Sequence, residues 1–338
     1  MIPRVGFLGT GWIGRHRMKA MLDSGAVEAA AIFDPSPECL AEAQAIATDA
    51  LGVGSFEAML AMGLDGIVIA TPSAQHAAQS IAALRSGAAV FCQKPLSRTA
   101  AEARKVVAAA KAADRLLGVD LSYRHTQAMQ AIAGLVQSGT LGRLFAIDLT
   151  FHNAYGPDKP WFYDRALSGG GCVIDLGVHL VDLALWALGF PDVSDVHAVL
   201  LGGGAPLAPG GVEDYATAQF SAGGVDVRLA CSWRLNAGQD AVIEAAFYGT
   251  EGGAALRNVG GSFFDFTADH FRGTSSTRLV DPPDDWGGGA AIAWARTLAA
   301  SPCFDRQAEE LVRLAEVLDD IYAAAPALPE TAVRLVRS

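Results

Sequence analysis

The sequence predicts an α/β protein with two domains. The first is built around a parallel sheet, and the second is an α+β domain with a large, mostly antiparallel open sheet. Up to residue 121, short apolar runs alternate with helical patterns, which is typical of βαβ units. From residue 122 onward, longer strands with alternating polar and apolar residues dominate. A length of 338 residues also exceeds one ordinary domain, so we assign 1–121 to the first domain and 122–338 to the second.

The first half contains strands that are continuous apolar runs, which fit a sheet covered on both faces. Ser36 and Pro37 have the residue types of an N-cap and a first helical position, so a helix is expected to begin there. Ser73 is expected to cap a helix in the same way. The expected strands are 5–8, 29–33, 66–70, 88–92 and 116–121, and the other expected helices are 12–24, 73–86 and 99–113.

In the second half, Gly-rich turns such as Gly223-Gly224 join successive strands, which favours antiparallel pairing. Residues 202–211 are expected to form a linker, and an amphipathic helix at 306–325 is expected to pack the chain's end onto the body, with the first domain as one option. Helices on one face would leave the other for a partner subunit. The expected strands are 143–151, 193–201, 215–221, 225–233 and 241–248, and the expected helices are 126–138 and 173–188.

Composition excludes several classes of protein. A net charge of −11 without a cluster of Lys and Arg argues against binding to nucleic acid or to anionic membranes. We see no secretory signal, and no apolar run approaches the ~20 residues that a membrane helix needs. The cysteines are far apart and lack a C-x-x-C pair, which argues against a disulfide framework or a zinc site and favours the cytoplasm.

A glycine loop near the N-terminus carries the clearest chemical signal. The run G-T-G-W-I-G at 9–14 follows a strand and opens a helix, and Asp34 ends the next strand twenty positions after Gly14. This context is the dinucleotide fingerprint of a Rossmann domain, in which backbone amides face the pyrophosphate. Asp34 would accept hydrogen bonds from the ribose hydroxyls, which favours NAD over NADP. Arg15 and Arg17 leave NADP open.

Two further motifs follow strands of the same sheet, where ligand crevices form. Thr71-Pro72 leads to His76, for which the alternative is a surface residue in the first turn of a helix. Gln93-Lys94-Pro95 places a lysine that could polarise a substrate oxygen or help to move a proton. The alternative for Lys94 is a solvated loop residue. The X-Pro bond could be cis.

A fourth motif lies in the second domain. Three glycines at 169–171 lead into a helix in which Asp175 and His179 are four residues apart and so share a face. An Asp and a His held in this way can bind a hydroxyl and exchange its proton. Asp182 lies nearly on the same side. No further metal-ligand set is recognisable, so no metal is expected. The alternative for His179 is a hydrogen-bonded histidine at a helix surface.

In this order, the four motifs resemble the Gfo/Idh/MocA oxidoreductases, which include glucose–fructose oxidoreductase and inositol dehydrogenase. The resemblance covers nearly the whole chain. It implies an NAD(P)-dependent oxidoreductase that transfers a hydride between nicotinamide and a carbinol of a sugar, polyol or cyclitol. It also implies a homodimer or homotetramer formed through the open sheet. Gln93 departs from the family pattern, because the corresponding motif is usually E-K-P.

The resemblance also implies site residues. Lys94 matches the lysine of E-K-P, while Asp175 and His179 match D-x-G-x-H, so these three are expected to be catalytic. Arg124 resembles an often basic position bordering the substrate. The implied cofactor contacts are Gly9, Gly11, Trp12, Ile13, Gly14, Asp34, Thr71, Pro72, His76, Gln93 and Lys94. The candidate substrate contacts are Arg124, Asn153, Trp161, Asp175 and His179.

Two alternatives to a simple dehydrogenase remain. An enzyme of this kind could keep NAD tightly bound and use it for transient oxidation, as in glycosidic elimination or paired oxidoreduction. A non-enzymatic sensor of NAD and a sugar could use the same scaffold. Retention of Lys94, Asp175 and His179 argues against a sensor, while Gln93 leaves it open.

Overall fold

A computed structural model describes residues 1–284 and 286–325, which form two units. Unit 1 contains Met1–Ser122 and Gly287–Val312, and unit 2 contains Tyr123–Trp286 and the chain from Arg313. The sequence placed all of 122–338 in the second domain, whereas residues 287–312 in fact belong with the first. The expected C-terminal helix is divided in the same way, between Val312 and Arg313. Residues 326–338 of the expected second domain lie outside the described residues.

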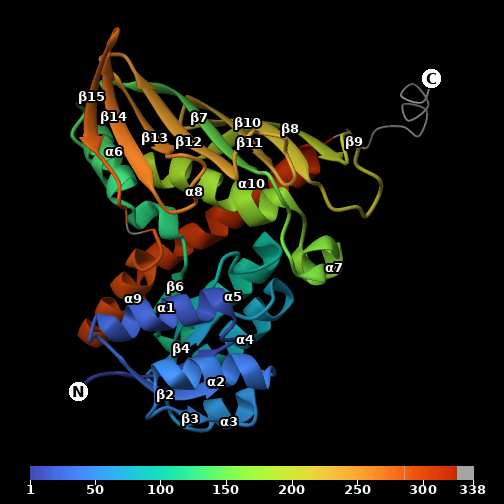
Figure 1. Cartoon of the computed structure of the whole chain (residues 1–338), viewed down its shortest axis with the longest axis vertical. Coiled ribbons are helices and arrows are strands. Elements are labelled where there is room, and N and C mark those ends of the chain that lie inside the picture. Colours follow the sequence, from blue (N-terminus) through green and yellow to red (C-terminus); the bar gives the residue numbers. More distant parts are fainter. Residues whose placement is uncertain (285, 326–338) are drawn as a thin grey trace. The chain divides into compact units, whose positions relative to one another are not determined.

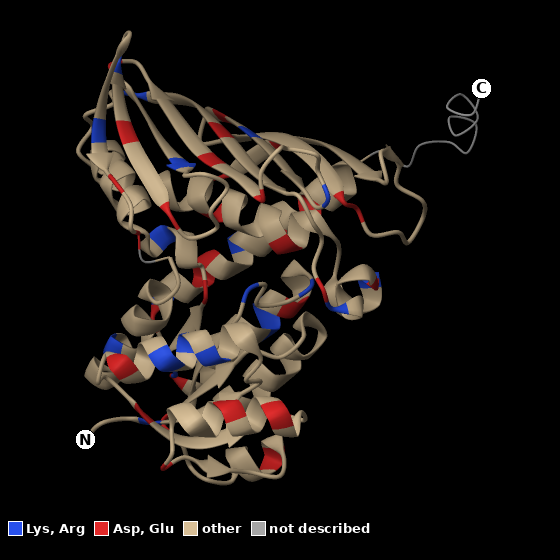
Figure 2. Ribbon diagram, viewed as in Figure 1, with Lys and Arg blue, Asp and Glu red and all other residues tan. Residues whose placement is uncertain are grey.

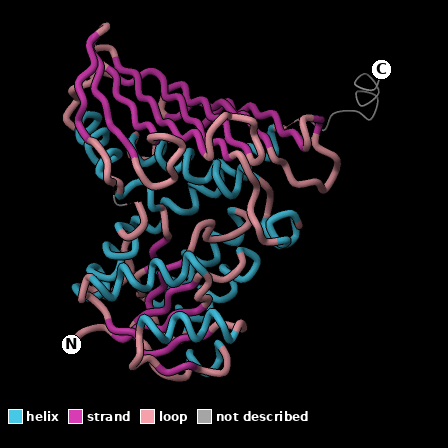
Figure 3. Tube along the Cα trace, in the orientation of Figure 1, coloured by secondary structure: helices cyan, strands magenta, loops and turns pink. Residues whose placement is uncertain are grey.

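Unit 1 is organised around a sheet that helices flank (Figures 1 and 3). All its strand pairings are parallel, in the order β3-β2-β1-β4-β5-β6. This is the order of a doubly wound dinucleotide-binding sheet, with the reversal between β1 and β4. The strands are β1 Arg4–Leu8, β2 Glu28–Phe33, β3 Leu51–Gly52, β4 Gly66–Ile69, β5 Ala89–Cys92 and β6 Leu117–Val119. The helices are α1 Trp12–Asp23, α2 Pro37–Ile46, α3 Phe56–Leu60, α4 Ser73–Arg85, α5 Ala100–Ala113 and α9 Gly289–Ala300.

Side-chain caps begin α2, α3 and α5, which are three of these six helices. Ser36 accepts a hydrogen bond from the Cys39 amide at the start of α2, as the sequence predicted. The prediction for Ser73 was wrong, because the N-cap of α4 is Pro72 and makes no side-chain hydrogen bond. Ser73 is already helical and only 4% exposed, so its side chain packs inside the unit.

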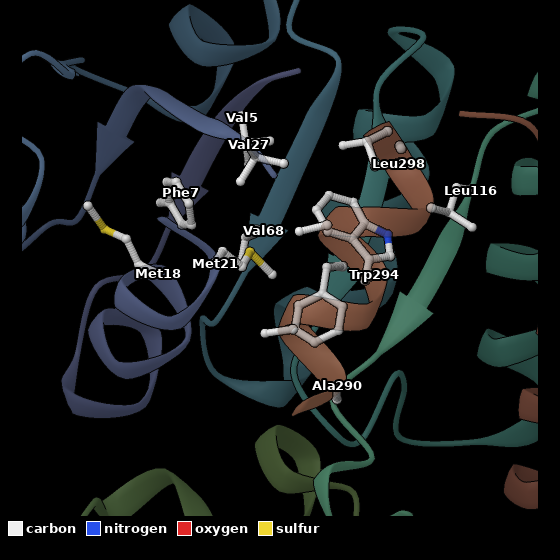
Figure 4. Packing of buried hydrophobic residues seen from close by; sticks show 14 of the residues in the cluster. Val5, Phe7, Met18, Met21, Val27, Val68, Leu116, Ala290, Trp294 and Leu298 are labelled. Carbon is white, nitrogen blue, oxygen red and sulfur yellow. The ribbon is translucent and has the colours of Figure 1, made fainter. Parts of the chain in front are cut away.

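Helix α9 belongs to unit 1 because its Trp294 fills space that two strand glycines leave. A Cβ added at Gly66 or Gly118 would come within 2.8 or 2.6 Å of the Trp294 ring. The ring also lies 5.6 Å from that of Phe91. Figure 4 shows Trp294 and Leu298 of α9 in the same core as Val68 and Leu116. The apolar residues of 289–300 are therefore a covering layer for the parallel sheet.

Unit 2 contains the larger sheet, in the order β15-β14-β13-β12-β7-β11-β10-β8-β9. Among the described strands of this sheet, only β11 and β7 pair in parallel, so the predicted mostly antiparallel sheet is confirmed. The strands that the sequence located are β7 Leu144–Asn153, β8 Val193–Gly202, β10 Tyr215–Ala222, β11 Val225–Ser232 and β12 Ala241–Gly249. Those it did not locate are β9 Ala205–Pro206, β13 Gly253–Asn258, β14 Phe266–Arg272 and β15 Ser275–Val280.

The stretch 202–211 is thus more than a linker, because β9 turns back to pair with the end of β8. Helices α6 and α8 lie against one face of the sheet (Figure 1). The α-helices of this unit are α6 Gln127–Gln137, α7 Arg165–Ser168 and α8 Val178–Ala187, joined by α10 Glu310–Ala324, which begins in unit 1. Short helical segments of other kinds are the 3-10 helices η1 Ser122–His125, η2 Pro160–Tyr163 and η4 Arg306–Glu309 and the π-type turn η3 Val173–Gly177.

The helical stretch Arg165–Ala187 is long and apolar enough to cross a membrane, contrary to the expectation that no such run exists. Its apolar window is 89% buried inside the protein. Burial of this kind is typical of a core helix, and here it places α8 beneath the sheet. Acidic and basic residues are interspersed along both units (Figure 2).

Candidate cofactor and substrate sites

The three glycines of the 9–14 loop differ in their surroundings. Gly9 has a φ of +85°, and a Cβ there would meet the Ala70 backbone at 2.7 Å. A Cβ at Gly14 would lie 2.3 Å from the Gly9 carbonyl oxygen, so this glycine lets α1 approach β1 closely. Nothing lies within 4 Å of a Cβ at Gly11. Two glycines therefore shape the loop, and the third leaves room for a ligand, as the fingerprint requires.

The start of α1 is suited to an anion. Gly11 is its N-cap and provides no side-chain hydrogen bond, and the first turn holds no acidic residue. Its first amides and its positive dipole end are thus available to a pyrophosphate. Trp12 is 58% exposed and lies 5.6 Å from the His16 ring, while Ile13 is partly buried.

Asp34 follows β2 and faces the same loop. Its Oδ2 accepts from the Thr10 amide at 2.6 Å, and its Oδ1 accepts from the Ser36 amide at 2.8 Å. The Thr10 hydroxyl also donates to Oδ2, at 3.3 Å. An ionised carboxylate has about four acceptor positions, so capacity for a ribose hydroxyl remains. The arginines that left NADP open are both engaged. Arg15 bonds the Thr10 carbonyl and Glu42, and Arg17 is 1% exposed within unit 1.

His76 joins the two motifs that follow β4 and β5. Its Nδ1 lies 2.7 Å from the Pro95 carbonyl oxygen, and its Nε2 lies 2.6 Å from that of Thr71. The ring is 1% exposed, which contradicts the alternative of a surface residue. Burial lowers the pKa of His76, although the two carbonyls partly oppose this and nearby Lys94 adds to it. The Lys94–Pro95 peptide bond is cis.

Gln93 and Lys94 occupy the carboxyl end of β5. Lys94 is half-buried, and Gln93 is 7% exposed. The side-chain amide of Gln93 donates from Nε2 to Asp120 Oδ2 at 2.7 Å. Arg17 donates from Nε to the same oxygen at 2.6 Å. Sequence reasoning missed Asp120, although a charged residue at the end of a parallel strand was a usable signal.

The glycines at 169–171 serve packing at the start of the helical run 173–187. A Cβ at Gly170 would lie 1.9 Å from the Tyr322 hydroxyl, and one at Gly171 would lie 1.9 Å from the Glu213 carbonyl oxygen. The Glu213 carboxylate accepts from the amides of Gly171 and Val173 and from the Tyr322 hydroxyl. Glu213 thus caps this helix from a distant segment. Sequence reasoning did not identify it.

His179 lies in an aromatic setting within unit 2. Its ring is 5% exposed and lies edge-on to Tyr123 at 4.8 Å, with Phe151 at 6.3 Å. Asp175 Oδ2 accepts from the Trp233 indole N–H at 3.0 Å. Asp175 lies in the π-type turn η3, where the Val178 amide bonds the Val173 carbonyl five residues back. Residue 175 lies in the π-type turn and residue 179 in α8, and four residues still make nearly one turn in either geometry, so the shared face stays a prediction.

Arg124 and Asp182 form an ion pair inside unit 2. The Arg124 guanidinium donates to both oxygens of Asp182, from Nε at 2.7 Å and also from Nη2. It also lies 5.2 Å from the centre of the Phe190 ring. Burial raises the pKa of Asp182, and the positive charge of Arg124 partly opposes this. Asp182 is thus engaged by Arg124.

The remaining candidate substrate residues lie near the end of β7. Asn153 Oδ1 is buried without a hydrogen-bond partner. Trp161 stacks on Phe162 at 3.8 Å, and both Phe162 and Tyr163 lie edge-on to Trp233. An aromatic group therefore connects Trp161, through Trp233, to Asp175. Among the described residues, no group of three or more His, Cys, Asp or Glu side chains could hold a metal ion.

Known proteins are similar to this chain in sequence and in fold. The model of the oxidoreductase family with an NAD-binding Rossmann fold matches residues 3–121, and that of the GFO/IDH/MocA C-terminal domain matches 129–255. The chain is 30% identical to inositol 2-dehydrogenase of Rhizobium meliloti (strain 1021) over 270 residues, 76% of either chain.

A second relative is D-glucoside 3-dehydrogenase of Escherichia coli (strain K12). It is 30% identical over 212 residues, which are 59% of this chain and 60% of that enzyme. Among solved structures, levoglucosan dehydrogenase in complex with NADH matches with a TM-score of 0.81 and 21% identity, covering 96% of both chains. At that identity, the likeness concerns the fold.

Proposed function

Since this chain belongs to the Gfo/Idh/MocA family of oxidoreductases with an NAD-binding Rossmann domain, we propose that it is an NAD-dependent dehydrogenase or reductase. Its substrate would be a carbinol, or the matching ketone, of a sugar, polyol or cyclitol. The observation that carries the proposal is the glycine loop, where Gly9 and Gly14 are sterically required while the space at Gly11 is open. The names of the relatives support the substrate class, because they act on inositol and a glucoside.

We propose one role for each of the three predicted catalytic residues. When bound, the nicotinamide supplies the hydride acceptor or donor. His179 would take the proton of the substrate hydroxyl, and the carboxylate of Asp175 would bind that hydroxyl in the reactive orientation. Trp233 restrains Asp175 through its indole hydrogen bond. Lys94 would stabilise the developing negative charge on the substrate oxygen.

The contacts around Asp34 support NAD over NADP. A 2′-phosphate would meet the negative charge of Asp34 and would need a cation to offset it. Arg17 is buried against Asp120, and Arg15 is held by Glu42 at 2.7 Å. Ribose hydroxyls, in contrast, need only the acceptor capacity that the carboxylate retains.

The proposed roles of Lys94 and His179 make a specific prediction. Lys94→Ala and His179→Ala should each lower turnover at least tenfold while NAD affinity stays within a few-fold of wild type. Nicotinamide absorbance with aldoses, polyols, inositols and sugar acids measures turnover, and protein fluorescence measures NAD binding. Lys105→Ala, at an exposed position on α5, is the matched control.

Normal turnover in both alanine variants would refute the catalytic assignment. If the wild type binds NAD yet yields no absorbance change with any substrate, the dehydrogenase proposal fails. NAD that stays bound through purification, with substrate conversion but no net NADH, would identify a transient-oxidation enzyme instead.

We also propose a homodimer or homotetramer formed through the sheet face of unit 2 opposite the helices. That face bears a hollow of about 520 Å³ lined by short side chains such as Thr150, Thr217 and Ala230, with the apolar Val199 48% exposed. The ion pair of Arg228 with Asp148 lies beside them at 2.8 Å. Small residues with paired charges can meet a second copy of the same surface.

A cytoplasmic location is a further proposal. The Cys172 and Cys231 sulfurs lie 3.8 Å apart as thiols, which suits a reducing compartment. Cell fractionation tests this, and recovery of the protein outside the cytoplasm would refute it.

A further inference from the structure

A buried charge cluster in unit 1 includes Gln93, the residue that precedes Lys94. Asp120, directly after β6, is 2% exposed, and Arg17 of α1 is 1% exposed. Both Arg17 Nε and Gln93 Nε2 donate to Asp120 Oδ2, at 2.6 and 2.7 Å. Gln93 directly precedes Lys94. The cluster thus connects α1 and the end of β6 to the loop that carries the lysine.

The chemistry of these groups fixes the orientation of the Gln93 amide. An ionised carboxylate only accepts hydrogen bonds, so Gln93 must present its NH₂ to Asp120 and its carbonyl oxygen elsewhere. A carboxylate at position 93 would instead meet Asp120 at contact distance as a like charge. Position 93 must therefore donate to Asp120, and the negative charge of this pair resides at position 120.

The second carboxylate oxygen of Asp120 indicates that this residue does more than form an ion pair with Arg17. Asp120 Oδ1 is buried and has no hydrogen-bond partner. Leaving such an oxygen unpaired costs free energy that a fully bonded pair would not incur. Other ionisable groups belong to the segments that meet here. Lys94 follows Gln93, His76 Nδ1 contacts the Pro95 carbonyl, and His16 Nδ1 lies 3.1 Å from Arg17 Nη1.

We propose that Asp120 is a positioning residue that holds the Gln93 amide and supplies, beside Lys94, the negative charge that Gln93 lacks. The catalytic part of this inference rests on the proposed dehydrogenase function. The charge arrangement itself does not, because it concerns contacts among residues of unit 1. The negative charge should then be able to move from position 120 to position 93, provided that position 120 receives an amide in the same protein.

The test is a double-mutant cycle of Gln93→Glu and Asp120→Asn. Gln93→Glu should lower kcat/KM at least tenfold at pH 8 and recover partly near pH 6, where one proton can bridge the two carboxylates. Asp120→Asn should also lower kcat/KM at least tenfold, because Arg17 loses its buried counter-ion. The double variant should recover to within about threefold of wild type, since the Asn amide can donate to the introduced carboxylate.

A second readout needs no activity. Thermal unfolding of the four proteins without cofactor is compared between pH 5.5 and 8. In Gln93→Glu, the folded state holds a proton that the unfolded chain releases, so its stabilisation is present at low pH and lost as pH rises. The stability of Gln93→Glu should therefore fall more steeply with pH than that of wild type, and this difference should disappear in the double variant. A Gln93→Glu protein with the wild-type slope, or a double variant less stable than both single variants, would overturn the proposal.

The two proposals can fail separately. If the unfolding data follow the expected cycle but no protein shows turnover, the charge arrangement stands and the dehydrogenase function fails. If wild type is active and kcat/KM of the double variant is no higher than that of the poorer single variant, the positioning role of Asp120 is overturned.

Discussion

At the scale of single residues, glycine is required for a different physical reason at each of three positions in the 9–14 loop. Gly9 needs its positive φ and lies against the Ala70 backbone, and Gly14 lies against the Gly9 carbonyl oxygen. Gly11 adopts a φ of −57°, which any residue can adopt, and has open space at its Cβ position. The fold accounts for the first two glycines, while Gly11 has a reason only if a ligand approaches it.

This difference predicts opposite phenotypes for two alanine substitutions. Gly11→Ala should leave the unfolding temperature nearly unchanged but weaken NAD binding at least tenfold, because its methyl group enters the pyrophosphate space. Gly14→Ala should lower stability by about 1–3 kcal/mol through overpacking. Thermal unfolding and NAD titration of both variants check this. Equal NAD affinity of Gly11→Ala and wild type would remove the loop from the cofactor site.

At the scale of one element, the helical run 173–187 depends on Glu213. Its carboxylate replaces the missing partners of the first amides, and Tyr322 donates to the same oxygen at 2.8 Å. Its second oxygen is buried without a partner. Burial raises the pKa of Glu213, and the hydrogen bonds from Tyr322, Val173 and Gly171 only partly oppose this. The helical run that carries Asp175 and His179 is therefore capped by a buried carboxylate whose ionisation is unfavourable.

The raised pKa makes stability depend on pH in a known direction. The folded state favours protonated Glu213, so this stabilisation is present at low pH and is lost as pH rises through the raised pKa. Glu213→Gln keeps an acceptor for the three donors but cannot ionise. From pH 5 to 8, wild type should therefore lose stability relative to Glu213→Gln, by about 1.4 kcal/mol per unit of pKa shift.

Thermal unfolding at several pH values measures this difference. Contributions from other groups with shifted pKa values, such as His76 and Asp182, are shared by both proteins and cancel. Glu213→Ala serves as the control, because it leaves two helix amides unpaired and should be less stable at every pH. Parallel curves for wild type and Glu213→Gln would contradict the assignment.

At the scale of the whole molecule, each sheet has two faces, and the structure shows what packs on them. In unit 1, α9 returns from late in the sequence to pack Trp294 against Gly66 and Gly118. In unit 2, helices α6 and α8 lie on one face, and the face with Thr150, Thr217 and Ala230 is open in one chain. A second copy of the chain is the proposed cover.

The proposed assembly is tested by Ala230→Arg, which places a long cation among the residues that line the hollow. Light scattering coupled to size-exclusion chromatography should find a dimer or tetramer for wild type and a monomer for the variant. Ala101→Arg, at an exposed position on α5, should assemble like wild type. A monomeric wild type at micromolar concentration would contradict the proposal.

The sequence by itself determined the features that depend on neighbouring residues. Continuous apolar strands and capped helices predicted the parallel sheet, alternating strands predicted the antiparallel one, and G-x-G-x-x-G with Asp34 predicted the dinucleotide loop. These signals are readable because each lies within one turn, strand or loop. The four motifs in order also resembled the family to which the chain belongs.

Only the tertiary structure decided which distant residues meet. Asp120 holds Gln93 across 27 positions, Glu213 caps a helix 40 positions earlier, and α9 joins a sheet begun almost 300 residues before it. The tertiary structure also pairs Arg17, which had left NADP open, with Asp120, and pairs Arg124 with Asp182. Such pairings follow from how elements pack around a core, and no local pattern of polarity or spacing encodes that packing.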